Sequence, residues 1–305
     1  MIPKSLLEAK PLGKVPVIVR IHGGFLVTGH SRYPPWFADW ILKFASSKGA
    51  VIISPNYRLL PESSGKDILE DMDDFWAWFS KGRADLLLKN SGVNISLDHD
   101  QVLAMGDGAG GYLAVQLALS YPSQIQAVIA ASPMLNLRSR FYAEYYRNKY
   151  MVGIQSSMKE VAEHCLWASQ QQDNMKPTEG EPPARLIMAF SMIQNGQYLG
   201  YFGTEDRGLF PLERVEDLAA AGTLQFPPLF IFHAEQDSAV PIDGTKALVE
   251  LLREKSPETR VMLHTQDGEH SFDRNATLET PWLSRGLEMI SQFWLKNEQQ
   301  PADSK

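Results

Sequence analysis

Short apolar runs alternate with amphipathic stretches of helical spacing along most of the chain. The apolar runs are bounded by turn residues, which is typical of buried strands in a parallel sheet. They predict strands over residues 15–21, 50–54, 101–105, 127–131, 228–233 and 259–264. The amphipathic stretches predict helices over residues 36–46, 66–80, 111–120, 243–255 and 282–296. This alternation indicates an α/β fold, with a mostly parallel sheet flanked by helices.

The interval between residues 136 and 222 breaks the alternation. It has no clear buried strand, and it is rich in methionine, polar residues and aromatic side chains, with tyrosines at positions 142, 145, 146, 150, 198 and 201. It predicts a mainly helical lid inserted into a single core, which is formed by residues 1–135 and 223–298 and followed by a flexible tail over 299–305. The tyrosines and methionines of the lid either pack the insertion together or line an apolar substrate pocket.

Composition and charge narrow the class of protein. With 29 Lys+Arg against 36 Asp+Glu, the net charge of −7 disfavours nucleic acid and anionic membrane surfaces as partners. One cysteine, Cys165, allows neither an intramolecular disulfide nor a cysteine-rich zinc site. The N-terminus lacks an apolar stretch of signal-peptide length, and no segment approaches the roughly 18 apolar residues of a membrane span. We therefore expect a cytoplasmic protein, with its oligomeric state open and a homodimer among the alternatives.

Metal and cofactor binding are not expected. The histidines outside the motifs described below have no metal-ligand spacing; they are His30, His99, His164, His233 and His264. A glycine-rich loop after the predicted strand 101–105 is the one candidate for a nucleotide, because Gly106, Gly108 and Gly111 fit the dinucleotide fingerprint G-x-G-x-x-G. That fingerprint normally follows the first strand and is paired with a later acidic residue for the ribose, and neither condition holds here. A dinucleotide site is therefore disfavoured.

The same loop fits a nucleophile elbow, the tight strand-to-helix turn G-x-S-x-G that exposes a serine above the sheet. Gly106 and Gly110 supply the small residues on either side of the turn. The central residue is Gly108, which relieves backbone strain but lacks the atom that would attack a carbonyl. A plain tight turn between a strand and a helix is the remaining interpretation.

Three features elsewhere in the chain favour the elbow. An early strand ends in RIHGG, where the amides of Gly23 and Gly24 can donate to an oxyanion. Asp237 ends a later strand at the carboxyl edge of the sheet, where α/β sites lie. His270 follows 33 residues further on, in a loop. The order of nucleophile position, acid and histidine is that of α/β-hydrolases.

With these motifs the chain resembles the hormone-sensitive-lipase-like branch of the α/β-hydrolase family, also called α/β-hydrolase fold-3, which contains carboxylesterases, lipases and deacetylases. The matching stretches are IHGGFLVTG at 21–29, YRLLPE at 57–62, GDGAGGYLA at 106–114, HAEQDSAVP at 233–241 and DGEHSFD at 267–273. The resemblance implies an α/β-hydrolase fold in which Asp237 and His270 are the acid and the base. It also implies an oxyanion hole made by the amides of Gly23, Gly24 and Ala109.

Two departures from the family pattern bear on the chemistry. The serine of the family's G-D-S-A-G maps to Gly108, so the resemblance implies that the covalent nucleophile is absent. The family's H-G-G-G motif reads HGGF here, with Phe25 in place of the third glycine. Cys165 and Ser238 do not lie at an elbow, and they are poor candidates for a replacement nucleophile.

Without the serine, efficient ester hydrolysis is not expected, because removing it from a triad costs on the order of 10⁶ in kcat. A histidine base that is polarised by an aspartate and faces amide donors suits removal of a proton α to a carbonyl, with stabilisation of the enolate. We therefore expect a non-hydrolytic lyase, cyclase or condensing catalyst acting on an apolar carbonyl compound in a secondary-metabolite pathway. One alternative is a carboxylesterase whose serine was replaced, naturally or by engineering. The other is a non-catalytic small-molecule-binding protein on the same fold.

Overall fold

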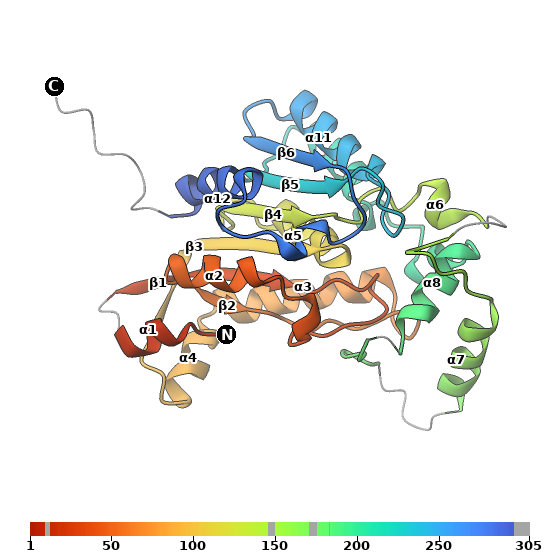
Figure 1. Cartoon of the computed structure of the whole chain (residues 1–305), viewed down its shortest axis with the longest axis horizontal. Helices are drawn as coiled ribbons and strands as arrows, with labels where there is room; N and C mark the ends of the chain where they lie inside the picture. The colour runs from red at the N-terminus through yellow and green to blue at the C-terminus, as the bar shows by residue number, and fades with distance from the viewer. Residues whose placement is uncertain (10–12, 146–149, 171–175, 183, 296–305) are drawn as a thin grey trace.

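The computed structural model describes residues 1–9, 13–145, 150–170, 176–182 and 184–295. Within them lies a six-stranded sheet in which every neighbouring pair is parallel, in the order β2-β1-β3-β4-β5-β6 (Figure 1). The strands are β1 (Lys14–Ile21), β2 (Val51–Ile53), β3 (Ser96–Asp107), β4 (Ala127–Ala131), β5 (Leu229–Ala234) and β6 (Val261–Gln266). The predicted α/β class with a parallel sheet is confirmed, and each predicted strand is present.

Strand β3 differs most from its prediction, because it begins at Ser96 rather than at residue 101. Its first half is polar and only partly buried, so it carries no apolar run. This half still pairs with the start of β1, where Lys14 lies opposite Ser96, before a register shift between Val15 and Val17. Backbone pairing at an irregular strand end therefore extends beyond the hydrophobic signal.

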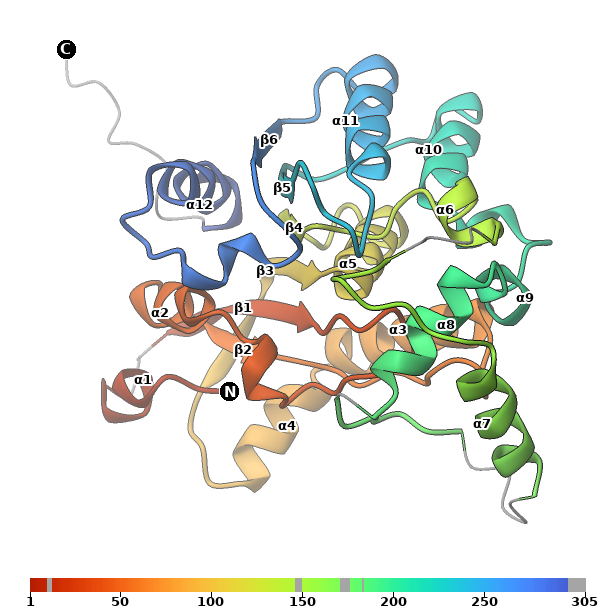
Figure 2. The same cartoon turned by 45° about the vertical axis from the view of Figure 1, so that its right-hand side comes forward.

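Helices cover both faces of the sheet (Figure 2). One face carries α2 (Asp39–Ser47) and α12 (Pro281–Trp294), and the other carries α3 (Gly65–Ser80), α5 (Ala109–Ser120) and α11 (Asp243–Lys255). Successive side chains of a strand point to opposite faces, so Val17 and Val19 pack with α3 and α5 whereas Ile18 packs with α2 and α12. None of the helices that the structure describes is long and apolar enough to cross a membrane.

The helix predictions were wrong at several ends and missed two short helices. Helices α1 (Lys4–Ala9) and α4 (Arg83–Asn90) each bury one apolar side chain, Leu6 and Ala84, so they give no clear periodic signal. Helix α2 begins later than residue 36, because a separate single turn of 3₁₀ helix occupies Pro34–Trp36. The predicted end of the last helix at residue 296 and the predicted tail lie outside the described residues.

Residues 136–222, here termed the inserted segment, contain helices and no regular strand among their described residues. The helices are α6 (Arg140–Ala143), α7 (Lys159–Ser169), α8 (Leu186–Gln194), α9 (Tyr198–Phe202) and α10 (Pro211–Ala220). Figures 1 and 2 both show α6, α7 and α8 beyond the carboxyl ends of the strands, while α10 lies beside α11. The first part of the inserted segment therefore covers the edge of the sheet where α/β sites form.

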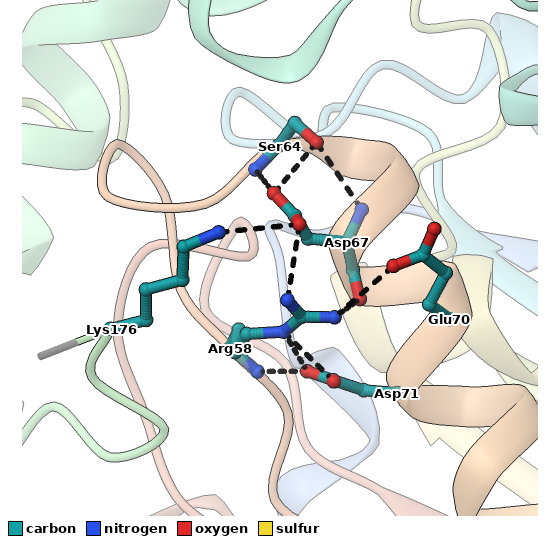
Figure 3. A network of polar contacts seen from close by, with 6 residues as sticks. All are labelled: Arg58, Ser64, Asp67, Glu70, Asp71 and Lys176. Carbon is teal, nitrogen blue, oxygen red and sulfur yellow. Dashed lines mark hydrogen bonds and ion pairs between the residues drawn. The ribbon is translucent and has the colours of Figure 1, made fainter.

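Arg58 is the centre of a polar network that joins the loop after β2 to the start of α3 (Figure 3). Its Nε donates to both carboxylate oxygens of Asp71, at 2.8 and 3.0 Å, and its Nη1 donates to Asp67 at 3.0 Å. Asp67 also closes a capping box with Ser64, and the hydrogen bonds from Ser64 lower its pKa to about 2. Lys176 of the inserted segment lies 3.3 Å from the same carboxylate. The network thus links the inserted segment to the core.

Candidate active site

Gly108 forms the turn between β3, which ends at Asp107, and α5, which begins at Ala109. Its φ of 53° and ψ of −112° belong to a region that glycine enters at little cost and other residues enter under strain. Its N–H donates to the carbonyl of Ala131 at the end of β4, at 2.9 Å. The geometry is that of the sharp strand-to-helix turn predicted as an elbow.

Gly110 lets the elbow lie directly against the end of β1. A Cβ on Gly110 would lie 2.1 Å from the carbonyl oxygen of Ile21, and a Cβ on Gly106 would lie 2.2 Å from the backbone of Gly110. No side chain larger than glycine fits at either position without moving the backbone. The close contact sets the elbow beside the loop that carries Gly23 and Gly24.

His270 faces this elbow. Its Nδ1 lies 2.7 Å from Oδ2 of Asp237, and a Cβ built on Gly108 would lie 3.6 Å from its Nε2. The carboxylate assigns the ring proton to Nδ1, so that Nε2 is left as the acceptor on the side of position 108. The structure therefore brings together the nucleophile position, the acid and the histidine that the sequence analysis singled out.

Asp237 is buried and held by four donors. Its Oδ1 accepts from the N–H groups of Ala239 and Val240 at 3.0 and 2.8 Å, and its Oδ2 lies 3.2 Å from Nε2 of His233 as well as close to His270. Burial alone would raise the pKa of Asp237, but the hydrogen bonds from the two histidines outweigh it and hold the pKa well below its usual range. The acid is thus an ionised carboxylate fixed behind the base.

The pKa of His270 is raised. Burial lowers it, but the hydrogen bond and the charge of Asp237 outweigh burial, and the nearby carboxylates of Asp107 and Asp273 act in the same direction. About 24% of the His270 side chain is exposed, and the residue lines a cavity. A histidine whose charged form is stabilised in this way is suited to accept a proton from a substrate.

His233 belongs to the site, although the sequence analysis dismissed it for lack of metal-ligand spacing. It is completely buried at the end of β5, with Nε2 2.9 Å from the carbonyl of Val240 and Nδ1 2.7 Å from Oγ1 of Thr245. A carbonyl only accepts, so Nε2 carries a proton that it can also donate to Asp237. The signal that could have identified it is a polar ring at the end of an apolar strand, four residues before the acid.

The loop after β1 carries the predicted oxyanion donors. Among the described residues, no backbone acceptor pairs with the N–H groups of Gly23, Gly24 and Ala109. Phe25, at the position of the family's third glycine, has a left-handed φ of 59°. Its ring packs edge-on against Phe190 of α8, with 5.7 Å between centroids. The aromatic side chain therefore joins the loop to the inserted segment.

His22 supports this loop from behind. Its ring stacks on Tyr57 with 4.3 Å between centroids, and its Nδ1 lies 2.8 Å from the carbonyl of Gly23. Burial lowers its pKa to about 3, so the ring is neutral. Beside it, the fully buried Arg20 donates to Asp107 at 2.7 Å. These contacts fit a scaffolding role for His22 and Tyr57.

The inserted segment is fastened to the far end of the same loop. Gly180 and Gly29 exchange backbone hydrogen bonds at 2.7 and 3.0 Å. Arg185 donates to the carbonyl of Val27 at 2.7 Å and to Glu62 at 2.6 Å. The position of the inserted segment and the shape of the glycine loop are therefore coupled.

A cavity of about 280 Å³ lies between these elements. Its ionisable lining residues are His270, Asp107, Asp273 and Arg274, and Gly23 and Gly24 line it as well, while Ala109 and Asp237 are buried and do not. Its other walls are mainly apolar and include Trp36, Trp40, Ile41, Met105, Leu186 and Phe190. The cavity suits a largely apolar ligand with a few polar atoms at one end.

Of the two alternatives for the tyrosines and methionines of the inserted segment, packing fits this cavity, because none of those that the structure describes lines it. Among the described residues, the cavity-lining members of the inserted segment are Val152, Leu186 and Phe190. Buried aromatic residues such as Tyr198 pack within the insertion instead, and Tyr146 lies outside the described residues. Cys165 and Ser238 do not line the cavity either, and no group of His, Cys, Asp or Glu in the described ranges is arranged to hold a metal ion.

Comparisons with known proteins identify the family. Residues 18–191 match the family described as the alpha/beta hydrolase fold. The chain belongs to the α/β-hydrolase family. This α/β-hydrolase is 30% identical over 294 residues to a "Probable carboxylesterase M8" of Phoma sp., covering 92% of this chain and 86% of that protein. It is 27% identical over 219 residues to a "Probable carboxylesterase clz11" of Cochliobolus lunatus, covering 66% and 92%.

Solved structures share the fold of this α/β-hydrolase. Esterase 2 of Thermogutta terrifontis, phosphonylated by sarin, has a TM-score of 0.55 at 19% identity and covers 93% of this chain and 84% of that chain. A protein of unknown function from Staphylococcus aureus has a TM-score of 0.62 at 19% identity, covering 94% and 92%. Together with the carboxylesterase relatives, they confirm the predicted family and fold.

Proposed function

We propose that this α/β-hydrolase removes a proton α to a carbonyl group in an apolar compound and stabilises the resulting enolate, as in lyase, cyclase or condensation reactions. The observation that carries the proposal is the position of His270. Its Nε2 faces an elbow at which Gly108 supplies no side chain, 3.6 Å from where a Cβ would lie. A carbon atom of the substrate can take the place that a nucleophile would occupy, directly against the base.

The chemistry assigned to the site follows from the residues present. Nε2 of His270 takes the proton, the electron pair of the broken C–H bond moves into the new C=C bond, and the carbonyl oxygen becomes anionic. Asp237 stabilises the imidazolium that forms, since it is held ionised 2.7 Å from Nδ1. The amides of Gly23, Gly24 and Ala109 are assigned as donors to the enolate oxygen.

An apolar substrate is proposed because the walls of the cavity are mainly aromatic and aliphatic. Trp36, Trp40 and Phe190 can bury the body of a ring or chain compound, while the polar atoms meet the ionisable lining residues. The curated relatives bear names of carboxylesterases, whose substrates contain an acyl carbonyl. Proton abstraction next to such a carbonyl needs no covalent nucleophile.

The test uses nitrobenzisoxazole, an apolar probe that a base opens by removing a C–H proton, releasing a coloured phenolate. We expect turnover by the wild type and a loss of about 10²-fold or more in His270→Ala, the usual contribution of a general base. The matched control is His264→Ala, which removes a histidine stacked on Trp282 outside the cavity and should leave turnover unchanged. Equal turnover by the wild type and His270→Ala would contradict the assigned base.

A carboxylesterase whose serine was replaced is the second candidate. The elbow geometry at Gly108 and the names of the relatives favour it, because a serine there would complete the constellation of an ester hydrolase. Two assays together separate the candidates: hydrolysis of short acyl p-nitrophenyl esters by Gly108→Ser, and proton abstraction by the wild type. Strong hydrolysis only in this variant, with no proton abstraction by the wild type, would favour the replaced esterase.

A further inference from the structure

Phe25 has a backbone conformation that a side chain disfavours. Its φ of 59° and the φ of 62° at Leu26 place two consecutive residues in the left-handed region, which residues other than glycine enter under strain. A glycine would take this conformation at little cost. Strained residues of this kind collect at functional sites, where the surrounding structure holds them in place. The aromatic side chain at this position is therefore a candidate for a role in the site.

Three donors hold the strained stretch. The carbonyl of Phe25 accepts a hydrogen bond from the hydroxyl of Tyr198 at 2.8 Å, and the carbonyl of Val27 accepts one from Nε of Arg185 at 2.7 Å. The carbonyl of the residue between them accepts from the backbone N–H of Leu60 at 2.8 Å. Because three successive carbonyls are bound, two of them by the inserted segment, the backbone cannot turn and carry the ring of Phe25 away.

Phe25 and Phe190 bound one side of the cavity. Their rings pack edge-on with 5.7 Å between centroids, and both residues line the cavity although they are buried. They belong to the hydrophobic cluster on the α5 side of the sheet. The lining residues Trp40, Ile41 and Met105 belong to the cluster on the α2 side. The cavity thus lies between two packed regions, and its walls are preformed.

The space between these regions is small. A cavity of about 150 Å³ with apolar walls holds one benzene molecule. The cavity here, with about 280 Å³, therefore has room for about two fused rings. An open chain with the same number of carbon atoms is longer than such a ring system, and it also loses more bond rotations when it is confined. The volume and the rigid walls both favour a compact ligand.

We propose that Phe25 determines the specificity of this site, and that the substrate is a compact, ring-containing carbonyl compound rather than one with a long open chain. The carbonyl group in this statement rests on the proposed function, whereas the selection of rings over chains does not. Phe25 excludes a chain because its ring fills the space between the glycine loop and Phe190 and is held there. Fused rings pack instead against the aromatic walls of the cavity, such as Trp36.

Two ketones of ten carbon atoms test this selection: α-tetralone, which has two fused rings, and 2-decanone, which is an open chain. Burial of apolar surface alone would favour 2-decanone, because its chain exposes more apolar surface to water. We expect the wild type to bind α-tetralone about tenfold or more tightly than 2-decanone, with both dissociation constants measured by NMR titration. Equal binding, tighter binding of 2-decanone or binding of neither ketone would overturn the proposal.

Phe25→Ala keeps a side chain on the left-handed backbone and opens the space beside Phe190. It should tighten the binding of 2-decanone relative to α-tetralone by about tenfold or more. The matched control is Phe75→Ala, which removes the same ring from α3, where it stacks on Trp78 and Phe79 outside the cavity. The control should keep the preference of the wild type. An unchanged preference in folded Phe25→Ala, or the same shift in Phe75→Ala, would overturn the role of Phe25.

Thermal melting accompanies these titrations, because removing a buried ring destabilises a core. If Phe25→Ala does not fold, Phe25→Leu fills most of the same space and should shift the preference in the same direction by a smaller factor; no shift would overturn the proposal. Binding needs no proton transfer, so the proposed function fails separately. Tight binding of α-tetralone without exchange of its α protons by His270 would contradict the proposed function and support the selection by Phe25.

Discussion

Gly108→Ser is the substitution whose outcome the geometry constrains most tightly. The new Cβ would lie 3.6 Å from Nε2 and 3.8 Å from Cε1 of His270, and no other described residue away from the turn itself comes within 4 Å, so the space is open. A hydroxyl one bond further on reaches the ~2.6–3.2 Å that a nucleophile and its base require. The backbone cost is real, because φ stays at 53° and a strained residue of this kind costs about 1–3 kcal/mol.

The matched control is Gly108→Ala, which adds the same Cβ and the same strain without a hydroxyl. Both variants should lose about 1–3 kcal/mol of unfolding free energy, measured by urea denaturation. Only Gly108→Ser should hydrolyse short p-nitrophenyl esters, with a rate on the order of 10³-fold or more above that of Gly108→Ala, since a missing nucleophile costs up to ~10⁶ in kcat. Proton abstraction should be slower in Gly108→Ser, because the new hydroxyl would hydrogen-bond to Nε2 of His270 and take the place of the substrate carbon.

The same two variants can refute the interpretation of the turn at Gly108 as an elbow that faces His270. If Gly108→Ser folds with the stability of Gly108→Ala and hydrolyses esters no faster, position 108 does not present a side chain to His270. The interpretation of the turn as an elbow would then be wrong. Hydrolysis that appears equally in Gly108→Ala would locate the activity elsewhere in the chain.

Three further predictions concern the base, its support and the inserted segment. The rate of nitrobenzisoxazole elimination should rise with pH through a midpoint above 6.5, because the pKa of His270 is raised and the base must be neutral. Asp237→Asn should lower that midpoint, because it removes the charge that raises the pKa of His270. His233→Leu removes a donor that competes for the carboxylate of Asp237, so an NMR titration of the His270 ring should give a higher pKa than in the wild type. Arg58→Lys loses the bidentate contact with Asp71 and should destabilise the fold by about 1–3 kcal/mol, measured by thermal melting. Lys176→Ala should cost ~1 kcal/mol or less, because the ion pair of Lys176 with Asp67 is more exposed.

Acid pH should also weaken the fold through Asp237. The pKa of this carboxyl is lower in the folded chain than in the unfolded chain. Its contribution to stability is therefore complete above the unfolded value of about 3.9 and is lost as pH falls through the folded value. Urea denaturation between neutral and acid pH measures this loss, which should be smaller in Asp237→Asn.

The sequence predicted the sheet well because buried parallel strands are continuous apolar runs. Strand β4 and helix α11 lie where the spacing of apolar residues put them. The polar half of β3 was not predicted, because it is held by backbone pairing and carries no apolar run. The short helix α4 was not predicted either, because its single buried side chain gives little periodic signal. The packing of the inserted segment depends on contacts between distant residues, such as Gly29 with Gly180, which no local pattern contains.

The site was only partly predictable for the same reason. Gly108, Asp237 and His270 stand in motifs, and chain order alone suggested that they meet. The burial of His233 against Asp237 and the hydrogen bond between Trp40 and Asp273, which are far apart in the sequence, became visible only in the folded chain. The cytoplasmic location, a homodimer and a place in secondary metabolism stay predictions.

The measurement that tests the central claim most directly is exchange of the α protons of an apolar ketone in D₂O. With α-tetralone as the probe, NMR follows the loss of the proton signal in the presence of the wild type, His270→Ala or the control His264→Ala. We expect the wild type and His264→Ala to exchange the protons about 10²-fold or more faster than His270→Ala, because only they retain the base beside Gly108. Exchange that is equally fast, or equally absent, in all three proteins would contradict the account.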